Sequence, residues 1–346
     1  MLPRAYDEAH RNRTKLPHSA SRTAPWGVNP RSASHPARIP PVVHPRAYSL
    51  FILASLVGLT LSGCHPGNAE AKQLRSSCDA GDADACNQFA VKLQKGEYVL
   101  QDDKDAAQRF AIACEGGVGD ACASLGVAYL SGRGIKRDSA RALTLLQQGC
   151  DRGGMDGCAR LGVEYQRGAG VPKDPTRAAT LYQKACDGGN ITGCGRLGTL
   201  YATGEGVRQD VPRAAELLKR SCDADVPVGC LGLGRLHATG SGVARNDSVA
   251  AVLFDEACTG GEVDGCFERA VAFETGRGVE QNLHDAADLY REACEDRHGE
   301  ACFRLAGMYD TGAGVYRQPN EAKRFRGRAC DFGYTLACEK PKEAAS

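Results

Sequence analysis

The stretch from Cys114 to Cys158 reads CEGGVGDACASLGVAYLSGRGIKRDSARALTLLQQGCDRGGMDGC and contains one full period of a repeat. Its two ends carry the same Cys-x7-Cys element, displaced by 36 residues. The element recurs without an insertion along nearly all of residues 65–346, which indicates an internal repeat architecture. Sixteen cysteines form eight pairs of this spacing: Cys78 with Cys86, Cys114 with Cys122, Cys150 with Cys158, Cys186 with Cys194, Cys222 with Cys230, Cys258 with Cys266, Cys294 with Cys302, and Cys330 with Cys338.

The first half of each period predicts a helix with a defined end. Cys122, Leu125, Gly126 and Tyr129 stand at i, i+3, i+4 and i+7, which is one face of a helix. A glycine then follows in every period and predicts the helix stop, because glycine adopts the left-handed conformation without a steric cost. These glycines are Gly96, Gly132, Gly168, Gly204, Gly240, Gly276 and Gly312, and from Gly134 onward a second one follows two residues later.

The second half of each period predicts another helix with an N-cap. Asp138 stands where a side chain can accept from free backbone N–H groups, and it is matched by Asp102, Asp174, Asp210, Asn246 and Asn282. Gln318 departs from this pattern, so we expect the last cap to be weaker. Ala142, Leu145, Leu146 and Gly149 form the apolar stripe of this helix, with small residues at its ends.

Each period is therefore predicted to be a helical hairpin, and the fold class is all-α with no strand signal. A single hairpin cannot bury its stripe on both sides, so neighbouring hairpins must stack into a solenoid. On one continuous helix, cysteines eight residues apart would be separated by about 12 Å. A disulfide requires Cα atoms within roughly 7 Å, so the chain must turn between the two cysteines, and glycines such as Gly116 and Gly117 permit this. Each short bridge would contribute roughly 2.5 kcal/mol in the chain-entropy model.

Metal binding is the alternative interpretation of so many cysteines. Structural zinc sites pair cysteines two to four residues apart, whereas these pairs are wider. Histidine is also scarce after residue 64, where only His65, His237, His284 and His298 occur. Because the apolar segment 49–61 is typical of an export signal, the pattern favours disulfides over zinc and predicts no metal and no other cofactor.

The N-terminal region predicts export and lipid anchoring. The apolar segment 49–61 follows the basic residue Arg46 and is too short to span a membrane, so residues 46–63 are predicted to be a signal peptide. It ends in Leu61-Ser62-Gly63-Cys64, which resembles a bacterial lipobox and predicts lipidation of Cys64. Residues 1–45 are predicted to be a disordered extension, or a stretch upstream of a true start near Val42 or Val43. His65 after the lipidated cysteine favours the outer membrane.

The charge distribution gives no reason to expect a nucleic-acid partner. The whole chain carries a formal net charge of +1, yet residues 1–64 alone hold eight basic and two acidic side chains. The body that follows is therefore mildly acidic, and it lacks the basic footprint of a nucleic-acid-binding protein.

The repeated motifs together resemble those of a known repeat family. Leu-Gly-x-x-Tyr, Gly-x-Gly-Val, a capping Asp, an Ala-rich helix and the Cys-x7-Cys turn resemble the Sel-1-like repeat, in the disulfide-bridged form of the Helicobacter cysteine-rich proteins. The resemblance spans residues 64–340 and leaves a short tail at 341–346. It implies a right-handed α/α superhelix whose concave face binds an envelope protein or peptide.

The same resemblance implies an alternative function, because some cysteine-rich members are described as penicillin-binding proteins with weak β-lactamase activity. A serine β-lactamase needs Ser-x-x-Lys, Ser-Asp-Asn and Lys-Thr-Gly, and none of these motifs occurs in the sequence. We therefore assign no catalytic residue. The candidate binding residues are positions that break the repeat: His237 in a tyrosine position, Arg269 in a core leucine position, and Arg297 with His298 in a glycine turn.

Overall fold

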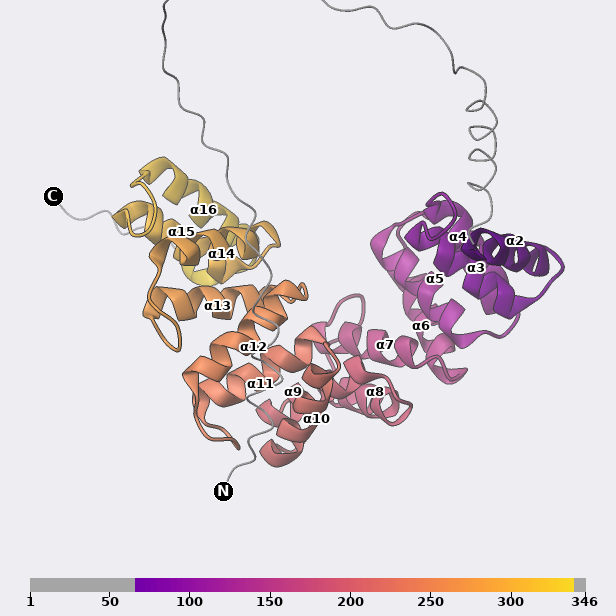
Figure 1. The fold of residues 1–346 in the computed structure, drawn as a ribbon, viewed down its shortest axis with the longest axis horizontal. Coiled ribbons are helices and arrows are strands. Elements are labelled where there is room, and N and C mark those ends of the chain that lie inside the picture. The colour runs from indigo at the N-terminus through magenta and orange to yellow at the C-terminus, as the bar shows by residue number, and fades with distance from the viewer. Residues whose placement is uncertain (1–65, 339–346) are drawn as a thin grey trace, which may run out of the picture. The chain divides into compact units, whose positions relative to one another are not determined.

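The structure is a computed structural model that describes residues 66–338. These residues form fifteen α-helices and one 3-10 helix, with no strand among them (Figure 1). The helices are α2 (Pro66–Asp79), α3 (Ala83–Lys95), α4 (Asp103–Glu115), α5 (Gly119–Ser131), α6 (Ser139–Asp151), α7 (Met155–Arg167), α8 (Pro175–Asp187), α9 (Ile191–Thr203), α10 (Val211–Asp223), α11 (Pro227–Thr239), α12 (Asp247–Thr259), α13 (Val263–Thr275), α14 (Leu283–Glu295), α15 (Gly299–Thr311), α16 (Pro319–Asp331) and η1 (Thr335–Ala337).

A disulfide spans the tight turn that follows each even-numbered helix. Cys114 lies at the end of α4 and Cys122 at the start of α5, and the other seven bonds occupy the equivalent places. The Cα–Cα distances across the eight bonds range from 4.4 to 4.9 Å. Each bond joins cysteines eight residues apart, so the chain reverses between them as the spacing requires. The all-α solenoid with a disulfide in every repeat is thus confirmed.

The wider loop of each repeat is built from the predicted glycines and caps. Gly132 ends α5 at φ +75°, in the left-handed region, and its N–H donates to the carbonyl of Ala128. Asp138 then caps α6 by accepting from the N–H of Arg141 at 3.0 Å. The side chain of Gln318 makes no capping hydrogen bond to α16, so the prediction of a weaker last cap is also confirmed.

The second glycine of the loop touches the preceding repeat. A Cβ atom added at Gly134 would overlap the main-chain oxygen of Asp103. The equivalent residue one repeat earlier is Tyr98, at φ +61°. Its ring lies over Gly67, which occupies the place of Asp103, so two compensating differences preserve the contact.

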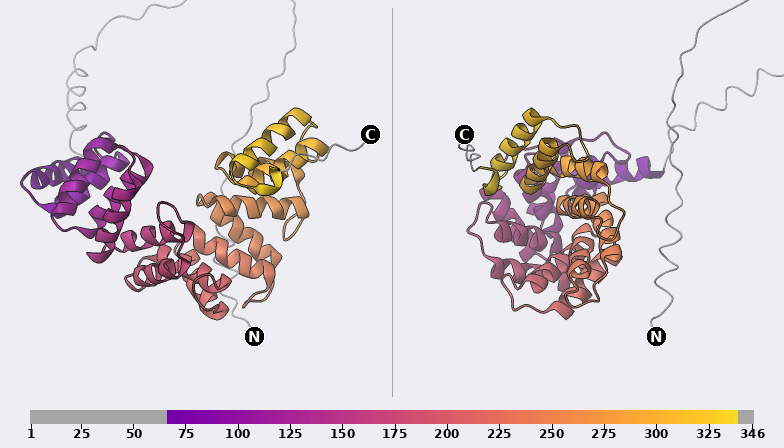
Figure 2. Two further views of the ribbon diagram at one scale, coloured as in Figure 1. Left: turned by 180° about the vertical axis from the view of Figure 1, so that it is seen from behind. Right: turned by 90° about the vertical axis from the view of Figure 1, so that its left-hand side faces the viewer.

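Consecutive helices pack along the whole described chain, and the hairpins follow one another in sequence order (Figures 1 and 2). The buried residues are mostly alanine, leucine and cysteine, with a few large side chains such as Phe110, Tyr182 and Tyr290. Small residues bring backbones together as predicted: a Cβ added at Gly149 would lie 2.8 Å from the main-chain oxygen of Gly119. Beyond the hairpins, α5, α7, α9 and α11 each also contact the next odd-numbered helix, and these contacts create a continuous face from α5 to α13.

Several sequence predictions lie outside the described residues. These are the extension 1–45, the signal peptide 46–63, the lipidation site Cys64 and the tail 341–346. Within residues 66–338, every helix is too short or too polar to cross a membrane.

Candidate functional site

The face formed by α7, α9, α11 and the start of α13, here called the odd-helix face, contains a hollow of about 220 Å³. Residues of α7, α9 and α11 line it, and the turn before α13 completes it with residues 260–262. The residues that line it include Arg160, Asn190, Thr192, Arg196, Pro227 and Glu262. The hollow therefore combines two guanidinium groups, amide and hydroxyl groups, the two carboxyl groups of Asp156 and Glu262, and apolar rim atoms.

Arg196 lies in this hollow beside a buried tyrosine. Tyr182 is fully buried and its hydroxyl donates to Oε1 of Gln166 at 2.8 Å. Burial raises the pKa of Tyr182 to about 12, while Arg196 and Arg167 act in the opposite direction. Arg196 is half-buried and forms no ion pair with a carboxylate of residues 66–338.

The same constellation occurs three repeats later with a different charge balance. Tyr290 is the counterpart of Tyr182, and its hydroxyl donates to Oε2 of Glu274 at 2.6 Å. Arg304, the counterpart of Arg196, binds Glu274 at 3.0 Å and Glu300 at 3.1 Å. Burial lowers the pKa of Arg304, but Tyr290 and these two carboxylates outweigh that effect and raise it. The arginine of the later copy is therefore ion-paired within the chain, whereas Arg196 is not.

Carboxylates also neutralise Arg235 on α11. Its guanidinium lies 3.2 Å from Asp264 and 2.8 Å from Glu268, both on α13. Burial lowers the pKa of Arg235, but the hydrogen bond and charge of Glu268, supported by Asp264, raise it overall. The C-terminal part of this face is thus held by ion pairs between neighbouring helices.

Glu262, like Asp156, is a carboxyl group that lines the hollow. It stands at the N-cap position of α13, but its side chain does not cap the helix. Burial raises the pKa of Glu262, and Arg196, Arg167 and Arg235 oppose this shift without forming an ion pair with it. Asp156, at the rim, accepts instead from Nδ2 of Asn190 at 2.5 Å.

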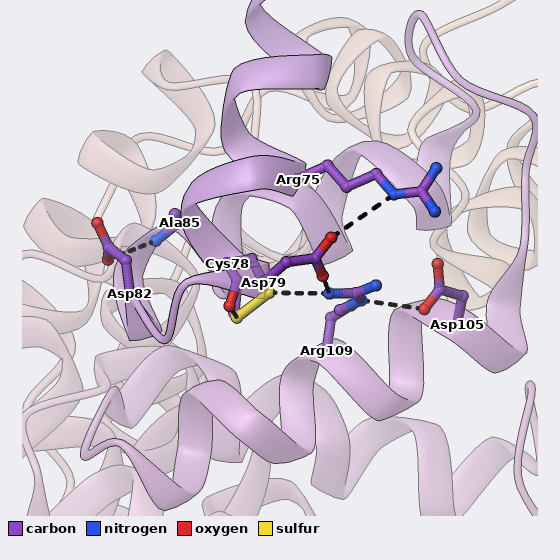
Figure 3. The surroundings of a disulfide bond; sticks show 8 residues. Arg75, Cys78, Asp79, Asp82, Ala85, Asp105 and Arg109 are labelled. Carbon is purple, nitrogen blue, oxygen red and sulfur yellow. Dashed lines mark hydrogen bonds and ion pairs between the residues drawn. A yellow bond between two sulfur atoms is a disulfide. The ribbon is translucent and has the colours of Figure 1, made fainter.

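A second repeated feature covers the disulfides. Figure 3 shows the first example, in which Arg109 of α4 places a guanidinium nitrogen 3.3 Å from Sγ of Cys78. Arg109 also pairs with Asp79 and, at 3.1 Å, with Asp105. The hydrogen bond from Arg109 lowers the pKa of Asp79 against the effect of burial. Cations of later repeats contact the preceding disulfide in the same way. Arg152, the residue after α6, contacts Cys122, and on the even-numbered helices Lys184 contacts the carbonyl of Cys150, Arg220 contacts Cys186 and Cys194, and Arg328 contacts the carbonyl of Cys294.

Two consecutive disulfides carry a carboxylate in this place instead. Glu256 accompanies Cys222 and Cys230, and Glu292 accompanies Cys258 and Cys266, with all ligand atoms of each group within 4.8 Å. These are the only groups of metal-ligating type among residues 66–338. Their cysteines are joined as disulfides, and thiolates rather than disulfide sulfurs are the usual metal ligands.

The four predicted binding residues each make local contacts. Nδ1 of His237 lies 3.2 Å from the carbonyl of Ala244 in its own loop. Arg269 pairs with Asp255 and lies over Phe273. Arg297 adopts φ +71° in the glycine turn and lies over Phe332. His298 caps α15 through Nδ1, and its ring stacks on Phe267 at 4.4 Å. Their role in binding stays a prediction, and none of the four lines the hollow around Arg196.

The helices and bonds described above define a class of protein, the α-solenoid of disulfide-bridged helical hairpins. Six stretches of the chain match the family model of the Sel1 repeat, at residues 119–154, 156–190, 192–226, 227–262, 263–298 and 299–331. They cover more than half of the sequence, so this chain belongs to the Sel1 repeat family. Sel1 repeats build scaffolds that generally bind other proteins. The first hairpins, before residue 119, lie outside the match but have the same helices and bonds.

Two solved structures show the same fold, and a third is similar over part of this chain. A protective antigen present in uropathogenic Escherichia coli strains, described as displaying an SLR fold, is 26% identical with a TM-score of 0.51. The match covers 77% of this chain but only 57% of the antigen. A Sel1 repeat protein from Oxalobacter formigenes is 24% identical with a TM-score of 0.52, covering 78% of both chains. Helicobacter pylori cysteine rich protein B is 29% identical over 36% of this chain and 88% of its own, with a TM-score of 0.30. No curated protein is detectably similar in sequence.

Proposed function

We propose that this chain is an exported, lipid-anchored scaffold that binds a protein or peptide of the cell envelope through a concave face, and that the odd-helix face is this face. The observation that carries the proposal is how the repeated positions are used. They pack the helices, cap them, turn the chain or cross-link it, which leaves the variable positions of the odd-numbered helices for a partner. The hollow at Arg196 is the clearest of these variable places.

The disulfides support the exported location. Eight bonds in residues 66–338 indicate an oxidising compartment outside the cytoplasm. The apolar segment 49–61 and the lipobox-like Leu61-Ser62-Gly63-Cys64 support processing and acylation at Cys64. A lipid at this cysteine would hold the solenoid at a membrane surface without a spanning helix.

The anchor is tested by the intact mass of the protein purified from membranes. We expect a mature chain that begins at Cys64 and carries lipid there. Cys64→Ser should release the chain from membranes with its fold unchanged, because Cys64 is outside the paired cysteines. An unmodified chain that retains residues upstream of Cys64 would overturn this part of the proposal.

Binding is tested by immobilising the oxidised protein and, in parallel, the reduced and alkylated protein. We expect the oxidised form alone to retain a defined envelope protein or peptide, because only the cross-linked solenoid presents the intact face. Equal retention by both forms would contradict the proposal. So would hydrolysis of a chromogenic cephalosporin that survives purification and disappears on a single side-chain substitution, since that result would favour the β-lactamase alternative.

A further inference from the structure

We propose that the hollow around Arg196 binds a carboxylate side chain of an acidic, extended peptide segment of the partner. This inference rests on the proposed binding function and deepens it by naming the chemistry of the partner. It starts from the two copies of one constellation in the same chain, of which only the later one has its arginine in ion pairs.

The two copies differ in the residues that would compensate the arginine. Arg304 has Glu274 from the preceding odd-numbered helix and Glu300 from its own helix as partners. At the equivalent positions, three repeats earlier, Arg196 has Gln166 and Thr192. Both carboxylates are thus replaced by neutral side chains, while the arginine and the buried tyrosine below it are kept. A guanidinium in a half-buried hollow binds a carboxylate best, often through two parallel hydrogen bonds.

A second guanidinium lies one repeat away on the same face. Arg160 occupies on α7 the position that Arg196 occupies on α9, and it is exposed and forms no ion pair within residues 66–338. Asp156, four residues before Arg160, is already engaged by Asn190. The odd-helix face therefore presents two arginines that form no ion pair, on neighbouring helices and at the same register, with Glu262 as the carboxyl group that acts on Arg196 from within the hollow.

The spacing of these arginines specifies an extended peptide. Neighbouring packed helices lie about 8–10 Å apart. A polyproline II strand repeats every three residues and rises about 3.1 Å per residue, so every third side chain points the same way at about 9 Å intervals. Acidic residues at i and i+3 of such a strand fit Arg160 and Arg196. Pro227 and its neighbours Val226 and Val228 supply apolar rim contacts beside them.

The probe is a fluorescent, C-terminally amidated peptide of repeated Glu-Ala-Pro, and its partner peptide has glutamine in place of every glutamate. Both are titrated into the oxidised full-length protein in detergent. A third peptide, with glutamine throughout and a free C-terminal carboxylate, separates side-chain binding from terminus binding. We expect saturable binding of the glutamate peptide, weakening at higher salt, and at least tenfold weaker binding of the other two.

The chain supplies its own matched control. Arg196→Gln should weaken the glutamate peptide at least tenfold, whereas Arg304→Gln, at the same helix position, should change its affinity less than twofold. Gln166→Glu with Thr192→Glu should also abolish binding, because this pair installs the carboxylates that the later repeat already tolerates. Equal effects of Arg196→Gln and Arg304→Gln, or equal binding of glutamate and glutamine peptides, would overturn the proposal, as would binding of the free-terminus peptide alone.

The experiment also separates this inference from the function on which it rests. If the oxidised protein retains an envelope partner and Arg196→Gln retains it equally well, the acidic site is wrong and the scaffold function stands. If the glutamate peptide binds through Arg196 but the protein retains no envelope partner, the site is right and the proposed function is wrong.

Discussion

Oε2 of Glu256 lies 3.6 Å from Sγ of Cys222, so a carboxylate covers a disulfide of the preceding repeat. Arg220 occupies the same helix position one repeat earlier, and its guanidinium lies 2.8 Å from Sγ of Cys186. Two adjacent disulfides of the same geometry therefore sit in opposite electrostatic surroundings.

This difference predicts the order in which the bonds are reduced. Glutathione attacks a disulfide sulfur as its thiolate anion, and the sulfur that leaves also becomes a thiolate. Glu256 disfavours both charges and Arg220 favours both, each by about 1 kcal/mol at 4 Å in water-like surroundings. The two effects together amount to about 2 kcal/mol, so we expect Cys186–Cys194 to be reduced by glutathione about 30 times faster than Cys222–Cys230, as measured by timed alkylation and peptide mapping.

The control for this prediction lies within one molecule. Glu256→Gln should speed the reduction of Cys222–Cys230 about fivefold, the factor that corresponds to about 1 kcal/mol. The bond between Cys258 and Cys266 keeps its own carboxylate, Glu292, and should not change. Equal acceleration of both bonds would mean that the substitution loosens the solenoid and that charge does not set the rate.

The loop glycines predict a difference in stability between two alanine variants. Gly278 and Gly261 both have positive φ, of +76° and +87°, so an alanine is strained by roughly 1–2 kcal/mol at either place. A Cβ at Gly278 would also overlap the main chain of Asp247, whereas a Cβ at Gly261 would meet nothing within 4 Å. We expect Gly278→Ala to lower the free energy of unfolding by at least about 2 kcal/mol more than Gly261→Ala. Denaturant unfolding of the oxidised protein measures the difference, and equal losses would show that the repeats do not depend on this close approach.

The last helix predicts a stabilising substitution. Gln318 leaves α16 without a side-chain cap, while Asn282, one repeat earlier, accepts from the backbone of His284 and Asp285. Gln318→Asp should stabilise α16 by about 1 kcal/mol, because a capping carboxylate satisfies a free N–H and complements the helix dipole. Amide hydrogen exchange in Pro319–Asp331 should slow accordingly. Gln318→Ala is the matched control and should leave the exchange rates nearly unchanged.

The repeated part of the fold could be predicted from sequence because each repeated residue type has one dominant physical reason. Gly132 marks a left-handed helix end, Asp138 marks a cap, and the cysteine spacing of eight residues requires a turn. Even the exception at Gln318 behaves as predicted. These signals are local, because each residue lies within a few positions of the helix end, cap or turn that it determines.

The site could not be predicted in this way, because its signal is a difference between residues that are far apart in sequence. Arg196 and Arg304 occupy the same position in their repeats, and they differ because Gln166 stands where Glu274 stands in the later copy. That difference is informative only once the structure shows that each arginine lies beside the helix of the preceding repeat. The predicted binding residues are instead positions at which a single residue departs from the type that is usual in the repeat. His298 illustrates the limit of that criterion, because its departure is explained by helix capping and by stacking on Phe267.

Glu262 predicts how the affinity for an acidic peptide depends on pH. Its carboxyl group lies in the same hollow as Arg196, and burial already raises its pKa. The charged groups that face it are Arg196 on α9, Arg167 on α7, Arg235 on α11 and Asp264 on α13. A bound carboxylate adds negative charge and raises the pKa of Glu262 further, so binding takes up a proton.

The affinity of the glutamate peptide should therefore rise as the pH falls from 8 toward about 5.5, above the pKa of about 4.3 at which the peptide itself is protonated. Glu262→Gln should bind about fivefold more tightly than the natural protein at pH 7, since it removes about 1 kcal/mol of repulsion. Its affinity should also be nearly independent of pH in this range. Thr192→Asn, a neutral change at the same rim, controls for altered packing. Weaker binding by Glu262→Gln would contradict this prediction, because it would mean that Glu262 stabilises the bound peptide as a hydrogen-bond acceptor and does not repel it.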